Sequence, residues 1–351
     1  MEKRITIRDI AAEVGVSTGT VHRAIYGKKG VSAEIQEKIL DVCTKRGYRA
    51  NAAASALKRS PLRIVGAFPV PDRKGSFFYS NVWKGFRRCM EEVRDYNIEV
   101  VELFYYEGPD HNQSAELLSC YKRYDGKIDA LVTIGHFDAD GEKAVRVYTE
   151  HDIPVFLACD DTADCGRIAC VQANYDMTGR MAAELLSSQI SPGSAVLLCA
   201  GDVLIPSHHQ TVGGFESYLH ENQLGLDLIK LYGYSNEQDL RTRLRAELER
   251  RTDIRGAFSV SARLSILLAD AVSSLSKEDS VRIVASDLFG ETIRNMEAGI
   301  VKNILYKNPE QQAYLATKCM CDYLLKAQKP INDVQYVESH IIFKSSLDMY
   351  R

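Results

Sequence analysis

The chain opens with TIRDIAAEVGVS at residues 6–17, and this stretch runs directly into TGTVHRAI at residues 18–25. Apolar side chains recur at helical spacing in both halves. Gly15 lies between them and permits the positive φ that ends a helix, and Ser17 is a favoured cap for the next helix. Two short helices joined by a tight glycine turn are typical of a helix-turn-helix, whose second helix enters the major groove of DNA.

The flanking residues extend this prediction. Thr6 and Asp9 have the spacing of a capping box at the start of the first helix. Ser32 is expected to cap a third helix. The apolar stripe of that helix would consist of Ile35, Ile39, Val42 and Cys43. An ordinary small helical subdomain is the alternative interpretation, since many short helix pairs have a glycine between them.

The charge distribution favours DNA binding over that alternative. Residues 1–60 contain 12 Lys and Arg against 6 Asp and Glu, a net charge of +6, whereas the whole chain carries −3. Residues 61–351 therefore carry −9, from −3 minus +6. A basic head on an acidic body confines the attraction for phosphate to the head.

A second motif follows the third predicted helix. The run I-x-D-I-A-x-x-V-G-V-S-x-x-T-V at 7–21 is joined by G-Y-x-x-N-x-x-A-x-x-L-K at 47–58. With both runs in place, residues 4–60 closely resemble the DNA-binding segment of the lactose repressor/galactose repressor family. The resemblance implies that the second run is a hinge that folds to a short helix on the operator, and that two such hinges pair.

The resemblance also implies that Leu57 wedges into the minor groove. Five alanines within residues 50–56 favour a helix and allow two helices to approach closely, and a small apolar side chain can kink DNA by unstacking a base step. A plain linker is the alternative for this segment. The DNA-contacting residues predicted by motif position are Thr6, Ser17, Thr18, Thr20, His22, Arg23, Asn51, Leu57 and Lys58.

The head departs from the family pattern at three positions. Ala50 replaces the usual Pro at the hinge entry, His22 replaces a Ser, and Gly19 stands where a base-reading side chain is often found. Glycine reads no base, whereas arginine pairs with guanine. Direct readout is therefore expected to rest more on Thr18 and Arg23.

Composition narrows the class of the protein. A chain of 351 residues with 45% hydrophobic residues suits two or three folding units. We find no apolar run of the roughly 18 residues that a membrane helix needs and no secretory signal pattern. Nine scattered cysteines without a C-x-x-C pair predict a reduced, cytoplasmic protein. Zinc ligation by Cys159, Cys165 and Cys170 is the less favoured alternative to structural burial, so neither a metal nor a cofactor is expected.

From residue 63 onward, short apolar runs alternate with helical patterns. The expected strands include 63–68, 98–104, 130–134, 155–158, 195–200, 229–234, 256–260 and 281–285. The expected helices include 80–96, 112–123, 175–190, 237–250, 262–275 and 309–327. This alternation predicts parallel sheets flanked by helices, with ligands at the carboxyl ends of the strands. No G-x-G-x-x-G or Walker loop occurs, which disfavours a nucleotide-dependent enzyme.

The body resembles the sugar-type periplasmic binding proteins, which form the effector domain of the same repressor family. The marks are I-V-G-A at 64–67, Phe77-Phe78, V-Q-A-N-Y-D-M-T-G at 171–179, Gly214-Phe215, Ser286-Asp287 and Y-K-N-P at 306–309. The resemblance implies two α/β lobes joined by crossings near 172–174, 305–309 and 328–335. The predicted domains are a head at 1–48, a hinge at 49–60 and an effector-binding domain at 61–351. Its first lobe would take about 61–172 plus 309–330, and its second about 174–306 plus 334–345.

Ligand-binding residues follow by motif position and strand ends. Phe77 and Phe78 match aromatic residues that stack on a sugar face, although core packing is the alternative. Asp287 would accept from two hydroxyls, unless it only caps a helix, and Arg263 would donate. His136 and Asp138 follow a strand, but a structural role is favoured for both.

Two departures bear on the ligand. Thr211 stands where related proteins often have an Arg, and Lys307 stands where they often have a Gln. His208 and His209 are expected in the same loop as Thr211 and could replace the missing donor. We therefore include His209, Thr211 and Lys307 among the candidate ligand residues. A phosphorylated or acidic sugar, an amino sugar or an inositol each fits part of this pattern.

These observations predict a transcriptional regulator, specifically a repressor, that binds operator DNA as a homodimer or tetramer under control of a sugar, sugar derivative or polyol. A solute-binding protein of a sugar transporter is the main alternative, and the basic head argues against it. An enzyme is the third class. Asp160-Asp161 is the paired carboxylate at a strand end, but an exposed loop pair is the favoured interpretation.

Overall fold

The structure, a computed structural model, describes residues 7–25, 30–46, 61–71, 77–107, 110–233 and 236–350. The chain divides into two units, residues 1–60 and residues 61–351. Thr6, Asn51, Leu57 and Lys58, and the whole predicted hinge, lie outside the described residues.

The head contains the three expected helices, α1 (Ile7–Val14), α2 (Thr18–Ile25) and α3 (Ala33–Lys45). Gly15 has a φ of +77° between the first two, and Ser17 Oγ accepts from the backbone N–H of Thr20 at 3.1 Å. The small core consists of Ile10, Ala11, Val21, Ala24 and Ile39, with Val14, Val16, Val31, Val42 and Cys43 packed against it. Ile35, which we expected in the stripe of α3, is 36% exposed, because it lies in the first turn of that helix outside this core.

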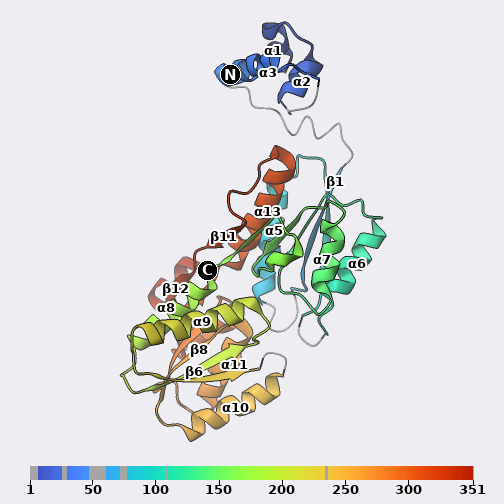
Figure 1. The fold of residues 1–351 in the computed structure, drawn as a ribbon. Helices are drawn as coiled ribbons and strands as arrows, with labels where there is room; N and C mark the ends of the chain where they lie inside the picture. The colour runs from blue at the N-terminus through green and yellow to red at the C-terminus, as the bar shows by residue number, and fades with distance from the viewer. Residues whose placement is uncertain are drawn as a thin grey trace. The chain divides into compact units, whose positions relative to one another are not determined.

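The first lobe of the body is built on a six-stranded sheet of order β11-β5-β4-β3-β1-β2. All of its pairings are parallel. The strands are β1 (Leu62–Pro69), β2 (Ile98–Tyr105), β3 (Ala130–Ile134), β4 (Val155–Ala158), β5 (Ala169–Ala173) and β11 (Val334–Val337). Helices α5 (Phe77–Glu92) and α13 (Pro309–Lys326) cover one face, and α6 (Gln113–Arg123) and α7 (Gly141–Thr149) cover the other (Figure 1).

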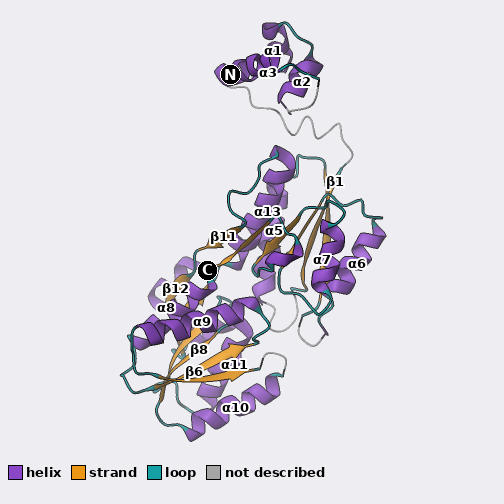
Figure 2. Cartoon of the chain, viewed as in Figure 1, coloured by secondary structure: helices purple, strands orange, loops and turns teal. Residues whose placement is uncertain are grey.

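The second lobe repeats this architecture with the order β12-β10-β9-β8-β6-β7. Its strands are β6 (Ala195–Gly201), β7 (Asp227–Tyr232), β8 (Ile254–Ser259), β9 (Arg282–Ser286), β10 (Val301–Tyr306) and β12 (His340–Phe343). Within the described residues of this lobe, only β12 pairs in the antiparallel sense. Its helices are α8 (Tyr175–Ser187), α9 (Pro206–Glu221), α10 (Glu237–Arg250), α11 (Ala262–Ser274) and α12 (Gly290–Glu297). Figure 2 shows the strands of this lobe enclosed by helices, and one apolar core fills it.

The chain passes between the lobes three times. The first two passages, at residue 174 and at residues 307–308, lie where the sequence predicts them. The third lies at residues 338–339 rather than near 328–335, because β11 pairs in parallel with β5 and so belongs to the first lobe. Gln312 ties two passages together, since it accepts from the Ala173 backbone N–H at 3.1 Å and donates to the Lys307 carbonyl at 2.6 Å.

All nine cysteines are free, and seven of them are buried, including Cys159, Cys165 and Cys170. In the part of the chain that the structure describes, no helix is both long and apolar enough to cross a membrane.

Candidate functional site

A cavity lies between the two lobes at the carboxyl ends of both sheets. It holds about 580 Å³ of space that is partly open to solvent. Residues that follow strands supply much of its wall, and α5, α8 and α9 present their first turns to it. The lining residues are Phe78, Tyr79, Glu107, His136, Asp160, Tyr175, Ile205, Ser207, His208, Ser261, Ala262, Arg263, Asp287 and Lys307. Two parallel sheets that face each other at these ends form the usual ligand cleft of such folds.

The wall from the first lobe is acidic and aromatic. Glu107 follows β2 and accepts a hydrogen bond from the Tyr79 hydroxyl. Asp160 follows β4, and its Oδ1 accepts from the Ser207 backbone N–H of the second lobe at 2.8 Å. Burial raises the pKa of both carboxyl groups, and the nearby His136 opposes this effect. The charged forms therefore lack the solvation that water provides.

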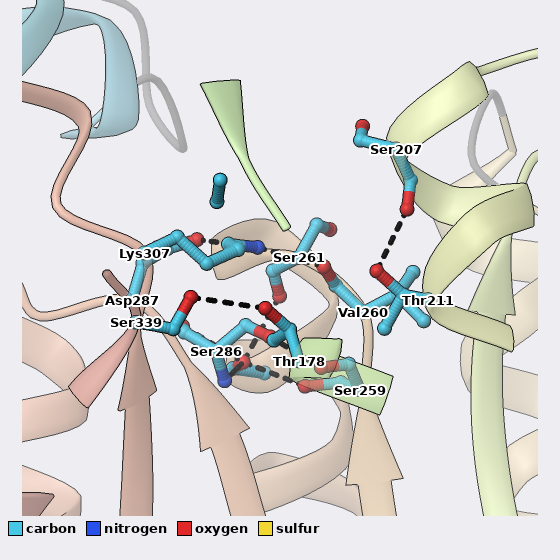
Figure 3. A network of polar contacts seen from close by, with 12 residues as sticks. Thr178, Ser207, Thr211, Ser259, Val260, Ser261, Ser286, Asp287, Lys307 and Ser339 are labelled. Atoms are coloured by element: carbon cyan, nitrogen blue, oxygen red, sulfur yellow. Dashed lines mark hydrogen bonds and ion pairs between the residues drawn. The ribbon is translucent and has the colours of Figure 1, made fainter. Parts of the chain in front are cut away.

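The wall from the second lobe carries a buried ion pair. Lys307 Nζ lies 3.0 Å from Asp287 Oδ2 and donates to the Val260 carbonyl at 2.9 Å (Figure 3). Asp287 is 3% exposed and Lys307 is 5% exposed. Burial raises the pKa of Asp287, and the Lys307 ammonium opposes that shift. Asp287 Oδ1 has no hydrogen-bond partner among the described residues.

His208 contributes a neutral imidazole. Its side chain is buried, and Nδ1 accepts from the Asp202 backbone N–H at 3.2 Å. Burial, together with Lys307 and His136, lowers its pKa to about 3. The ring is therefore uncharged near neutral pH and serves as a hydrogen-bonding group.

The structure brings together five of the nine predicted ligand residues: Phe78, His136, Arg263, Asp287 and Lys307. Arg263 Nε also donates to Glu237. Phe77 begins α5, but its side chain lies outside the described residues.

Three other predicted ligand residues do not line the cavity. Asp138 accepts from the backbone N–H and the hydroxyl of Ser114, at 3.0 and 2.8 Å, at the start of α6. Thr211 is buried and donates to the Ser207 carbonyl within α9 at 2.7 Å (Figure 3). His209 is exposed, whereas its neighbour His208 is buried and lines the cavity.

Sequence reasoning missed several lining residues, including Tyr79, Glu107, Tyr175 and Ser207. It also placed Asp160-Asp161 in an exposed loop pair, which is wrong. Asp160 is buried, and Asp161 pairs with Arg167, whose side chain is only 4% exposed. The available signal was position, since Glu107 and Asp160 each follow a predicted strand by a few residues.

In the head, the described candidates gather at the start of α2. Ser17, Thr18 and Arg23 are exposed. Arg23 Nη2 donates to Thr20 Oγ1 at 3.3 Å, and Thr20 Oγ1 lies 2.9 Å from Ser17 Oγ. The side chain of His22 lies outside the described residues. Exposed polar groups on the second helix are what base readout in the major groove requires.

Comparison with protein families matches both parts of the chain. Residues 6–51 match the family described as bacterial regulatory proteins, lacI family. Residues 67–329 match the family described as periplasmic binding protein domain.

Two relatives are named catabolite control protein A. The one from Staphylococcus epidermidis is 24% identical over 224 residues, which is 64% of each chain. The one from Staphylococcus aureus is 23% identical over 284 residues, or 80% of this chain and 77% of the relative. The match to the first of these thus spans less than two thirds of that relative's length.

Solved structures share the fold of the body. A glucose-galactose binding protein from Geobacillus stearothermophilus, GanP, superimposes with a TM-score of 0.70 at 20% identity, covering 82% of this chain and 99% of the other. A putative LacI transcriptional regulator from Bacteroides fragilis superimposes with a TM-score of 0.71 at 15% identity, covering 83% and 100%.

Proposed function

We propose that this chain, which belongs to the family described as periplasmic binding protein domain and whose residues 6–51 match the lacI family of bacterial regulatory proteins, represses transcription by binding operator DNA under the control of a small sugar-like ligand. The observation that carries the proposal is one chain that combines a basic helix-turn-helix with a polar cavity lined from two lobes. The same combination disfavours a solute-binding protein of a transporter, for which a DNA-binding head has no use.

The proposed control is allosteric. A ligand that contacts both walls binds the closed arrangement of the lobes more tightly than an open one, and it shifts the population by that difference in affinity. The lobe arrangement would set how two hinges at residues 49–60 pair. Hinge pairing would in turn set operator affinity.

We propose a homodimer that acts in the cytoplasm and has no catalytic activity of its own. A hinge helix of about ten residues is too short to be stable alone, so it requires a twin and DNA. A two-fold dimer reads two related half-sites.

The test begins with selection of a binding site from random DNA duplexes by the full-length chain. The expected result is a near-palindromic site bound far more tightly than random DNA, with an affinity that a sugar-like ligand changes. Sugar binding without any enriched DNA sequence would instead support the transporter candidate. A strict monomer in light scattering that still binds the selected site tightly would contradict the dimer.

A further inference from the structure

We propose that the cavity selects a polyol that carries a protonated amine, such as an amino sugar, and rejects sugar phosphates and sugar acids. This inference rests on the proposed function, because it assumes a sugar-like ligand between the lobes and names its chemical class.

Acidic groups outnumber basic ones in the wall. Glu107, Asp160 and Asp287 line the cavity, from three different strand ends and from both lobes. The lysine and arginine side chains that line it are Arg263 and Lys307. A ligand between the lobes therefore meets more carboxylates than fixed cations.

Both cations already have carboxylate partners. Lys307 pairs with Asp287 at 3.0 Å and also donates to the Val260 carbonyl at 2.9 Å. Arg263 donates to Glu237, a residue that does not line the cavity. A phosphate or carboxylate ligand would have to compete with Asp287 for Lys307, and breaking that buried pair is costly. The Arg263–Glu237 pair is more exposed, with 25% and 47% of the two side chains accessible, so it opposes an anion less strongly.

The remaining carboxylates receive neutral donors. The hydrogen bonds described above for Glu107 and Asp160 come from the Tyr79 hydroxyl and the Ser207 backbone amide. Burial raises the pKa of Glu107, Asp160 and Asp287 alike. A positive charge placed among them would offset the cost of keeping them ionised.

An unsatisfied acceptor supports the same conclusion. Asp287 is 3% exposed, and its Oδ1 has no hydrogen-bond partner in the described ranges. The Ser261 hydroxyl, which also lines the cavity, likewise has none there. A buried carboxylate oxygen without a donor costs free energy that an ammonium or hydroxyl donor of a ligand would recover.

The histidines decide how much negative charge remains. His208 is neutral near pH 7, since its pKa is lowered to about 3. His136 also lines the cavity, and it opposes the rise in pKa that burial causes at Glu107 and Asp160. Burial raises the pKa of Tyr175, so this phenol of the wall carries no charge at this pH. A neutralised cavity would show no preference for an amine.

The test compares sugars that differ in a single group. Calorimetry with the full-length chain near neutral pH would measure glucosamine, N-acetylglucosamine, glucose and glucose 6-phosphate, together with the galactose and mannose counterparts. We expect the best amine to bind at least tenfold more tightly than its N-acetyl and parent forms, and the phosphate to bind most weakly. Tighter binding of a phosphate, or equal binding of amine and parent sugar, would overturn the inference. Binding by no member of the set would overturn the proposed sugar control as well.

Two variants locate the charge that is responsible. Asp287→Asn keeps the side-chain shape, removes the charge and releases Lys307 from its partner. It should reduce the amine preference about tenfold and strengthen binding of the 6-phosphate. Glu107→Gln provides a second variant if Asp287→Asn fails to fold. Asp270→Asn is the control, because Asp270 is exposed, pairs with Arg241 and lies outside the cavity. An unchanged ratio of amine to parent affinity in both cavity variants would refute the assignment.

Discussion

Asp160 of the first lobe accepts a hydrogen bond from the backbone amide of Ser207 in the second lobe, at 2.8 Å. Ser207 is the second residue of the 16-residue helix α9, so its N–H has no partner within the helix. The carboxylate therefore meets the positive end of a helix across the cleft. This hydrogen bond holds the two lobes together, and both of its residues line the cavity.

Asp160→Ala should favour a more open arrangement of the lobes. The substitution removes the acceptor, so the backbone N–H of Ser207 loses its hydrogen bond. Leaving such a donor without an acceptor costs the closed arrangement about 1–3 kcal/mol. Small-angle X-ray scattering of the ligand-free protein would show a larger radius of gyration. Asp95→Ala, an exposed position of the same lobe outside the cavity, is the control. An unchanged radius in Asp160→Ala would rule out a role in closure.

His208 should make the protein less stable in mild acid. Its folded pKa of about 3 lies below the ordinary 6.5, so the unfolded state binds the proton first as pH falls. The stabilising contribution is complete above pH 6.5 and is lost as pH falls toward 3. By pH 5 the free energy of unfolding has fallen by about 1–2 kcal/mol through this residue. The raised carboxyl pKa values act in the opposite sense, so the measurement is the difference in urea unfolding between the wild type and His208→Asn. The exposed His209→Asn is the control, and a wild-type slope retained in His208→Asn would contradict the prediction.

Gly179→Ala should destabilise the second lobe strongly. A Cβ at Gly179 in α8 would lie 2.0 Å from the backbone oxygen of Thr211 in α9, so the two helices would have to separate. Overpacking of this kind costs about 1–3 kcal/mol or more. Gly213→Ala on α9 meets nothing within 4 Å. It should be neutral or stabilise by about 0.5–1 kcal/mol. Equal thermal shifts in the two variants would show that α8 and α9 do not approach this closely.

Arg23→Ala should weaken operator binding by about 1–3 kcal/mol and relax specificity at one base position of each half-site. The exposed guanidinium, bonded to Thr20 on α2, is placed to read a base edge. Binding would be measured by fluorescence anisotropy on a panel of single-base variants of the selected site. Lys38→Ala on α3 removes a charge and should leave base preference unchanged. A uniform loss across all sites in Arg23→Ala would point to a phosphate contact instead.

Leu57→Ala tests the hinge. The family resemblance assigns this leucine to the minor groove, where it would unstack a base step. The variant should lose DNA bending and operator affinity but keep non-specific binding, which is electrostatic. Circular-permutation gel shifts would measure the bend. If Leu57→Ala bends DNA as fully as the wild type, the hinge assignment is wrong and residues 50–59 are a linker.

The sequence could indicate which residues line the cavity where local rules apply, but not where packing intervenes. Asp287 could be placed because residues after parallel strands gather at one edge of a sheet, whereas Lys307 was placed by its position in the family motif. His208 and His209 are adjacent on α9, and sequence spacing does not tell which one faces the cavity. Thr211 aligns with a ligand-binding position, yet α9 directs it along its own backbone, where it donates to Ser207.

The sequence by itself determined the three-helix head, the charge division at residue 60 and the parallel α/β architecture, because caps, glycine turns and apolar periodicity act within a few residues. Only the tertiary structure decided that β11 joins the first lobe, that Asp160 reaches α9, and that Asp287 neutralises Lys307. Each of these contacts joins residues that lie between 20 and more than 160 positions apart. Such partners are selected by the folding of the whole domain, since no local pattern encodes which of many strand ends will meet.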